Sequence, residues 1–181
     1  MKNKALLHTV SIIACILCGI LLCVAQTSLI PRFINDSYLV PDLLLCLTVA
    51  LGMLGGAPYG AFFGIFAGIL ADSTGGFGIS LLPLFYMLCG YGASVVAELI
   101  PQKRFLVYHA VGLIAVIGRV LVAVIYVMLS SGNISLLDVI RYVCFPLLLG
   151  SCLALPATYP LGLLLTLPIK HIKQDSIDKI I

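Results

Sequence analysis

Long apolar stretches, separated by short polar or glycine-rich breaks, run along almost the whole chain. They cover approximately residues 6–30, 39–57, 58–71, 79–99, 105–131 and 139–169. A helix needs about 20 apolar residues to cross the hydrocarbon core of a bilayer, and somewhat fewer where the bilayer thins. The pattern therefore predicts six membrane-spanning helices in one domain, residues 1–169, followed by a short cytoplasmic tail, residues 170–181.

The second and third stretches form one apolar run that is too long for a single crossing. Glycine and proline interrupt this run at Gly52, Gly55, Gly56 and Pro58, and these residue types end helices and form turns. We therefore expect two short helices joined by a tight turn, which together make a glycine-rich helical hairpin.

Basic residues predict the orientation of the spans. With six spans and an internal N-terminus, the cytoplasmic segments hold seven basic residues: Lys2, Lys4, Lys103, Arg104, Lys170, Lys173 and Lys179. The outer segments hold two, Arg32 and Arg141. Because cytoplasmic loops carry an excess of lysine and arginine, this distribution favours six spans with both termini in the cytoplasm. Five spans would place Lys103 and Arg104 outside.

The overall composition agrees with a membrane protein. Hydrophobic residues make up 62% of the 181-residue chain and charged residues 9%, with a formal net charge of +3, and the mean hydropathy is +1.21. A soluble domain is closer to half apolar and a quarter charged. The composition predicts an all-α integral membrane protein, and the small net charge argues against a nucleic-acid surface.

Motifs for catalysis or metal binding are absent from the sequence. The seven cysteines all lie in apolar runs, and none has a histidine or carboxylate cluster at ligand spacing. No HExxH or GxSxG pattern occurs. We therefore expect no enzyme activity, no catalytic residues, no bound metal and no cofactor.

Small residues follow a regular spacing in the third stretch. Gly60, Gly64 and Gly68 lie four residues apart, and Asp72 follows at the same interval. In lipid, helices associate through close backbone contact, which small side chains permit. The spacing predicts a packing surface for another helix. Two occupants are possible: a helix of the same chain, which is the commoner case, or the transmembrane helix of a partner.

Charged residues in apolar surroundings are the strongest candidates for a functional site. Arg119 lies near the middle of the fifth stretch, where a charge costs about 2.5–3.5 kcal/mol. We expect a buried partner, preferably Asp72 or Asp42, with Glu98 as a third candidate and a backbone carbonyl as the alternative. Asp42 follows Pro41 at the start of a helix, where the helix dipole favours an acidic residue.

The sixth stretch contains prolines in its interior, Pro146, Pro156 and Pro160. Proline inside a membrane helix leaves a carbonyl group without its usual donor, and a neighbouring helix or hydroxyl group must replace that donor. Ser151 and Thr158 are candidates for this repair. Helices interrupted in this way can line transport sites, but a bent packing helix is the commoner interpretation.

Residues 40–92 contain several motifs in a fixed order. They are Pro41-Asp42 at the start of a leucine-rich helix, the glycine-rich helix from Gly60 to Asp72, the glycine turn at Gly75, Gly76 and Gly78, and Gly90-Tyr91 in the next span. A proline-bearing last span with Tyr159-Pro160 and a basic cytoplasmic end follow. In these motifs, and in its size and six-span layout, the chain resembles the MreD family of rod shape-determining membrane proteins.

The resemblance implies a fold and a function. The fold would be a six-helix bundle similar to the substrate-binding subunits of energy-coupling-factor vitamin transporters. The function would be that of a non-enzymatic subunit in the bacterial cytoplasmic (inner) membrane. It would bind the single-span protein MreC and support, directly or indirectly, MreB filaments, the glycosyltransferase RodA and its transpeptidase partner. Two alternatives remain open: a substrate-binding transporter subunit, and a proton path through Asp72, Arg119 and Glu98.

Overall fold

The structure, a computed structural model, describes residues 2–29, 41–75, 81–100, 104–130 and 136–177. All regular elements within these ranges are helices. They are α1 (Lys2–Val24), the π-helical turn η1 (Ala25–Leu29), α3 (Leu43–Gly55), α4 (Ala57–Gly75), α5 (Leu82–Leu99), α6 (Arg104–Ser130), α7 (Leu136–Val139), the π-helical turn η2 (Ile140–Cys144) and α8 (Phe145–Ile177). The all-α prediction is confirmed for this part of the chain. Gly76 and Gly78 of the predicted glycine turn lie outside the described residues.

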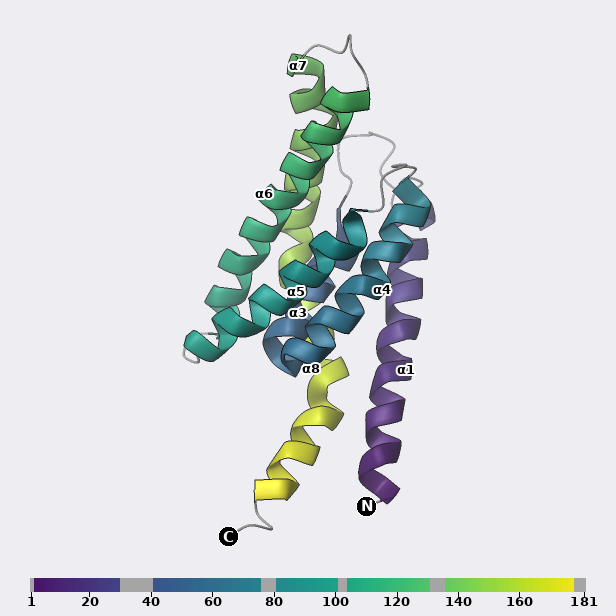
Figure 1. Cartoon of the computed structure of the whole chain (residues 1–181), viewed down its shortest axis with the longest axis vertical. Helices are drawn as coiled ribbons and strands as arrows, with labels where there is room; N and C mark the ends of the chain where they lie inside the picture. The colour runs from purple at the N-terminus through teal and green to yellow at the C-terminus, as the bar shows by residue number, and fades with distance from the viewer. Residues whose placement is uncertain (1, 30–40, 76–80, 101–103, 131–135, 178–181) are drawn as a thin grey trace.

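Successive long helices run in opposite directions along the molecule (Figure 1). Helices α1, α4 and α6 run one way, and α3, α5 and α8 run the other. The start of α1 and the end of α8 therefore point toward the same end of the molecule. Helix α8 continues to Ile177, beyond the predicted end of the last span at residue 169.

Four of the described helices are long and apolar enough to cross a membrane. Their candidate spans are Thr9–Ser28, Leu82–Leu99, Arg104–Leu129 and Phe145–Leu167. Helix α3 has 13 residues, about 20 Å at 1.5 Å per residue, which is shorter than a hydrocarbon core of about 30 Å. The chain is therefore a helical membrane protein with four candidate spans, and six spans stay a prediction because α3 and α4 are not among these four.

A tight turn joins α3 to α4, as predicted for the hairpin. Helix α3 ends at Gly55 and α4 begins at Ala57, so Gly56 alone links them. Gly56 has a φ of 95°, a left-handed conformation that glycine adopts without steric cost. Its N–H donates to the carbonyl of Gly52 at 3.1 Å, which closes the last turn of α3.

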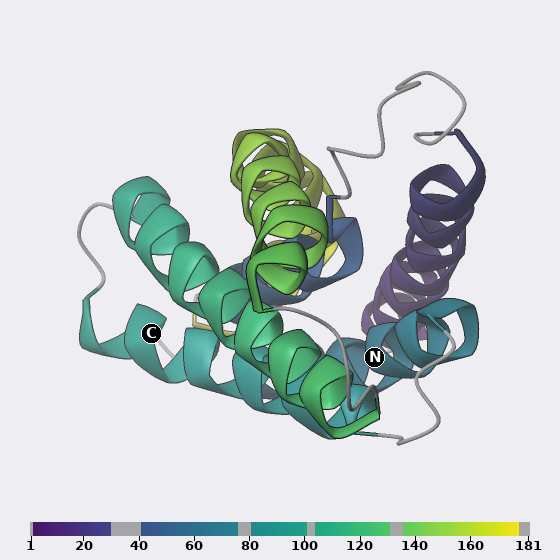
Figure 2. The same cartoon turned by 90° about the horizontal axis from the view of Figure 1, so that it is seen from above.

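Helix α3 forms the centre of the bundle. Viewed from above, it lies among α4, α5, α6 and α8 (Figure 2), and it contacts all four. Every residue from Leu44 to Leu54 is buried. Protein therefore covers α3 along this stretch, and a helix shorter than the hydrocarbon core need not expose its backbone there to lipid. The short helix is thus stabilised by its neighbours.

The glycines of α4 are covered by α5 of the same chain. A Cβ atom at Gly60 would lie 2.5 Å from the carbonyl oxygen of Gly90, and one at Gly64 would lie 2.6 Å from that of Tyr86. At Gly68, a Cβ atom would overlap the backbone at the start of α5. Only glycine permits backbones to approach this closely. Of the two predicted occupants, the structure therefore shows a helix of the same chain.

Gly52 belongs to this packing and not to the turn. The sequence places it among the residues that interrupt the apolar run, but it lies inside α3. A Cβ atom at Gly52 would overlap the carbonyl group of Gly90. The backbones of α3, α4 and α5 therefore meet at Gly52, Gly60 and Gly90, which we call the glycine contact.

Candidate functional site

Asp42 lies at the N-terminus of the central helix and is buried. Its Oδ1 atom accepts a hydrogen bond from the backbone N–H of Leu45 at 3.1 Å, so it caps α3. The first N–H groups of a helix have no intrahelical partners, and the helix dipole favours a negative charge there. Pro41, also buried, has no N–H group that would need a partner. The predicted role of Asp42 as a helix start is confirmed.

Arg119 of α6 forms an ion pair with Asp42. The Nε atom of Arg119 lies 3.4 Å from Oδ2 of Asp42, and both side chains are buried. The sequence predicts a carboxylate partner for Arg119 and names Asp72 or Asp42 as the preferred candidates; the structure shows Asp42. Removing one member of a buried pair leaves the other charge uncompensated, which typically costs 3–5 kcal/mol.

Three further polar side chains complete the surroundings of Asp42. The hydroxyl of Tyr86 in α5 donates to Oδ2 of Asp42 at 2.5 Å. The backbone N–H of Asp42 donates to Oγ of Ser151 in α8 at 3.0 Å. The side-chain oxygen of Gln26 in η1 accepts a hydrogen bond from the backbone N–H of Leu43 at 3.1 Å. We call Asp42, Arg119, Tyr86, Ser151 and Gln26 the Asp42 cluster.

The Asp42 cluster connects the N-terminus of α3 to four other helical elements. Its members outside α3 lie on η1, α5, α6 and α8. Sequence reasoning missed Tyr86 and Gln26 as members. Tyr86 lies four residues before Gly90, so both residues lie on one face of α5. This spacing was the feature of the sequence that could have indicated that Tyr86 points into the bundle. Nothing in the sequence around Gln26 indicated its role.

The predicted repair of freed carbonyl groups in α8 is wrong for both candidates. Ser151 accepts from Asp42. Thr158 donates to the carbonyls of Ala154 at 3.0 Å and Leu155 at 3.1 Å, neither of which precedes a proline by four residues. Thr158 also shares a hydrogen bond with the hydroxyl of Tyr108 at 2.7 Å. These hydroxyls therefore connect α8 to α3 and α6.

Other predicted site residues lie apart from the Asp42 cluster. Asp72 is half-buried in the last turns of α4, and its Oδ1 atom is buried without a hydrogen-bond partner among the described residues. Glu98 is exposed near the end of α5. Tyr91 is also exposed, whereas Gly90 beside it is buried. The Gly90-Tyr91 motif thus directs one residue into the bundle and the other outward.

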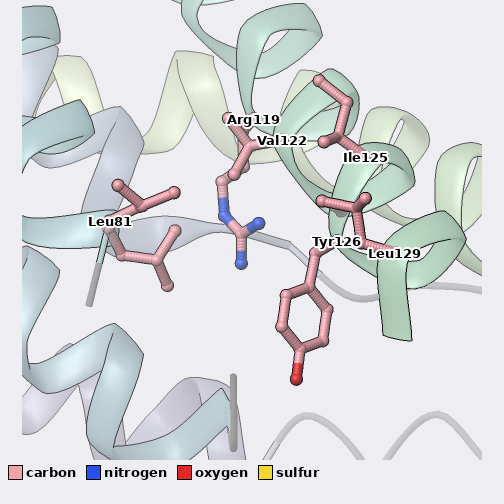
Figure 3. Close-up of a pocket in the computed structure, with 8 residues that line it drawn as sticks. Leu81, Arg119, Val122, Ile125, Tyr126 and Leu129 are labelled. Atoms are coloured by element: carbon pink, nitrogen blue, oxygen red, sulfur yellow. The ribbon is translucent and has the colours of Figure 1, made fainter. Parts of the chain in front are cut away.

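A small cavity lies beside Arg119. It has a volume of about 130 Å³ and is lined by residues from the start of α5 and from α6. Figure 3 shows the Arg119 side chain projecting between Leu81 and Tyr126. Pockets for drug-sized ligands usually measure about 300–1,000 Å³, so this cavity is small for a vitamin-sized molecule.

A larger groove opens between α1 and α4. It has a volume of about 500 Å³, and its walls include Ile12 and Ile16 of α1 and Phe62 and Phe66 of α4. Most of the lining side chains are bulky and apolar, in contrast to the glycines on the opposite face of the same helix α4. The groove is therefore a largely apolar surface of the bundle.

The polar groups of the Asp42 cluster are largely satisfied by one another and by the start of α3. No group of three or more His, Cys, Asp or Glu residues that could hold a metal ion occurs within the described ranges. The cluster contains one carboxylate and one guanidinium, which compensate each other, and hydroxyl and amide groups that satisfy the start of α3. The arrangement can fix the relative positions of α3, α5, α6 and α8.

The fold and the cluster thus define an all-helical membrane protein organised around a buried ion pair. Comparisons of the chain with models of protein families, with curated proteins and with solved structures gave no match.

Proposed function

We propose that the protein is a non-enzymatic subunit of the bacterial cell-elongation complex, in which it binds MreC and supports lateral cell-wall synthesis. It would lie in the cytoplasmic membrane with six spans, and both termini would be cytoplasmic. The alternating directions of the helices are compatible with this topology, since α1 begins and α8 ends toward the same end of the molecule (Figure 1).

The observation that supports this proposal most is the position of the residues that carry the family resemblance. Asp42 of the Pro-Asp motif caps the central helix and pairs with Arg119. The glycine-rich helix packs on Gly90 of the Gly-Tyr motif. Motifs built from small and apolar residues could occur by chance in any membrane protein. Here Asp42, the glycines of α4 and Gly90 lie in the core of one bundle, which favours a shared fold.

A substrate-binding subunit of a transporter is the alternative function. Such a subunit would need a pocket for a vitamin or metabolite. The centre of the bundle is filled by α3, and the cavity beside the buried charge of Arg119 measures about 130 Å³. The groove between α1 and α4, at about 500 Å³, is large enough for a small ligand, but its walls are mostly bulky apolar side chains, with few polar groups to orient a vitamin or metabolite. The filled centre and the apolar groove favour a scaffold over a substrate-binding subunit in the part of the chain that the structure describes.

Co-purification with MreC and depletion in cells test the proposal together. The tagged protein, produced with MreC of the same bacterium, should retain MreC through detergent purification, whereas the same tag on an unrelated membrane protein should not. Depletion of the protein should convert rods into spheres. Failure to retain MreC together with normal cell shape would contradict the proposal. A tightly bound small molecule in the purified protein would support the transporter alternative.

A further inference from the structure

Two prolines lie in the middle of the span of α8 and remove backbone donors there. Pro156 is the central residue of the segment Phe145–Leu167, and Pro160 follows one turn later. In a regular helix the N–H of each residue donates to the carbonyl four residues earlier. Because proline has no N–H group, the carbonyls of Cys152 and Pro156 lose their usual donors.

Both affected carbonyls lie on one face of α8. Residues 152, 156, 160 and 164 are spaced by four and form a single row along the helix, and all of them are exposed. Leu153 and Ala157, one position further along, are exposed as well. We call these six residues, Cys152, Leu153, Pro156, Ala157, Pro160 and Leu164, the proline face.

Within the described residues, the hydrogen bonds that join α8 to other helices do not replace the lost donors. Among the described residues, hydrogen bonds between α8 and its neighbours involve Ser151 and Thr158 and the carbonyl of Leu165. None of them reaches the carbonyl of Cys152 or of Pro156. In the hydrocarbon core a backbone group without a partner is unfavourable by several kcal/mol, and carbonyls freed by proline are satisfied by neighbouring helices, Ser or Thr side chains, ordered waters or local 3₁₀ or π adjustments of the helix. Helix α8 is α-helical throughout its length, and Thr158 donates to other carbonyls, so a neighbouring helix is the route that the proline face offers.

We infer that the proline face of α8 is the docking surface for the transmembrane helix of a partner protein, whose hydroxyl or amide side chains donate to the carbonyls of Cys152 and Pro156. The inference rests on the proposed function, because it assigns the MreC helix to this face. The side chains in the middle of the face, those of proline, alanine and cysteine, are small. A second helix can therefore approach closely, as is typical of helix contacts in membranes.

A second copy of this chain is a poorer occupant. In a two-fold dimer the proline face would meet itself, and its polar side chain is the thiol of Cys152, which is a weak donor. Lipid acyl chains have no donor at this depth. A helix of different sequence that carries serine, threonine, asparagine or glutamine is the occupant that satisfies both carbonyls.

Photo-crosslinking can locate the MreC helix on the surface of the protein. The photoreactive amino acid p-benzoylphenylalanine would replace Leu153 or Leu164 on the proline face, which are 63% and 64% exposed. Matched controls replace Leu88 of α5 and Leu121 of α6, which are 56% and 57% exposed. Irradiation of membranes that also contain MreC should crosslink MreC to the two proline-face positions and not to the controls.

The outcomes separate this inference from the proposed function. If MreC co-purifies but crosslinks mainly to the control positions, the docking surface is wrong and the proposed function stands. A product that joins two copies of this chain, or proline-face positions that react with lipid alone, also overturns the docking surface. If MreC does not co-purify, the proposed function fails and the inference fails with it.

Restoring the missing donors is a second test that does not depend on a disruptive variant. The double change Pro156→Ala and Pro160→Ala supplies N–H groups to both carbonyls and favours a regular helix. It should lower the affinity for MreC by roughly three- to twenty-fold, the effect of one interhelical hydrogen bond in a membrane. Pro58→Ala is the control, because Pro58 is exposed in the first turn of α4, where its N–H would have no partner. Unchanged affinity in the double variant would overturn the role of the carbonyls.

Discussion

Two contacts hold the centre of this protein together, and they use opposite means. The glycine contact of Gly52, Gly60 and Gly90 joins three helices through backbone atoms alone. The Asp42 cluster joins helices through side chains, with a buried ion pair and several hydrogen bonds. Both contacts involve α3 and α5. This one pair of helices therefore allows the contribution of shape to helix packing in a membrane to be compared with the contribution of charge.

The difference between the two contacts lies in what each tolerates. The glycine contact depends on volume, because a single methyl group would overlap a backbone carbonyl. It contains no side-chain polar group that could be left unsatisfied. The Asp42 cluster depends on chemistry, because each removed group leaves another buried polar atom without a partner. Substitutions that alter volume alone or charge alone should therefore affect one contact far more than the other.

The largest effect is expected from Asp42→Ala. This change leaves Arg119 buried without its carboxylate and also removes the cap of α3. The free energy of unfolding should fall by about 3–5 kcal/mol. The loss should appear as a lower midpoint of thermal unfolding in detergent, which size-exclusion chromatography detects. The control is Glu98→Ala, which removes an exposed carboxylate and should change the midpoint little.

A double variant shows whether charge is the cause. In Asp42→Ala with Arg119→Met, no charge remains unpaired, and replacing a buried ion pair by apolar residues is often close to neutral. The double variant should therefore be more stable than Asp42→Ala alone. Equal or lower stability of the double variant would show that the cap of α3, and not the ion pair, dominates the contribution of Asp42.

An intermediate effect is expected from Gly60→Ala. The added methyl group would lie 2.5 Å from the carbonyl oxygen of Gly90, so α4 and α5 must separate. Overpacking of this kind costs about 1–3 kcal/mol, measured by the same thermal assay. Gly92→Ala is the matched control, because a Cβ atom at Gly92 would meet nothing within 4 Å. Similar losses in the two variants would contradict the close contact between α4 and α5.

The smallest effect is expected from Gln26→Ala. Gln26 accepts one partly buried hydrogen bond from the N–H of Leu43. Its loss should lower the free energy of unfolding by about 0.5–1.5 kcal/mol. Gln26→Glu, which keeps an acceptor oxygen, should retain more stability than Gln26→Ala in the thermal assay at a pH above the carboxylate pKa. Equal stability of wild type and both variants would exclude a contribution of η1 to the Asp42 cluster.

The helices and the hairpin turn could be predicted from the sequence, because they depend on local properties. Runs of apolar residues and the break at Gly56 predict where helices begin and end. The partner of Arg119 could not be predicted, since Asp42 and Asp72 both lie beside glycine-rich spans. The choice depends on how α3 and α6 are rotated and placed relative to each other, and no local pattern encodes that.

The spacing of glycines illustrates the same limit. Gly60, Gly64 and Gly68 predict that a helix packs closely on α4, because small residues are what such contacts require. Whether that helix belongs to this chain or to a partner depends on which surface lies nearby in the folded bundle. The structure places α5 there. A Gly64→Leu variant would therefore disturb the packing of α4 on α5 within the bundle itself.

The sequence by itself determined that this is a helical membrane protein, approximately where its helices lie, and that Arg119 needs a buried partner, with a carboxylate preferred over a backbone carbonyl. Hydropathy, turn residues and the cost of a charge in lipid determine this much because they are properties of single segments. Only the tertiary structure decided that Asp42 is this partner, that Tyr86 and Ser151 support it, and that α5 covers the glycines. These facts depend on contacts between segments far apart in the chain, and the close packing of the whole bundle fixes such contacts.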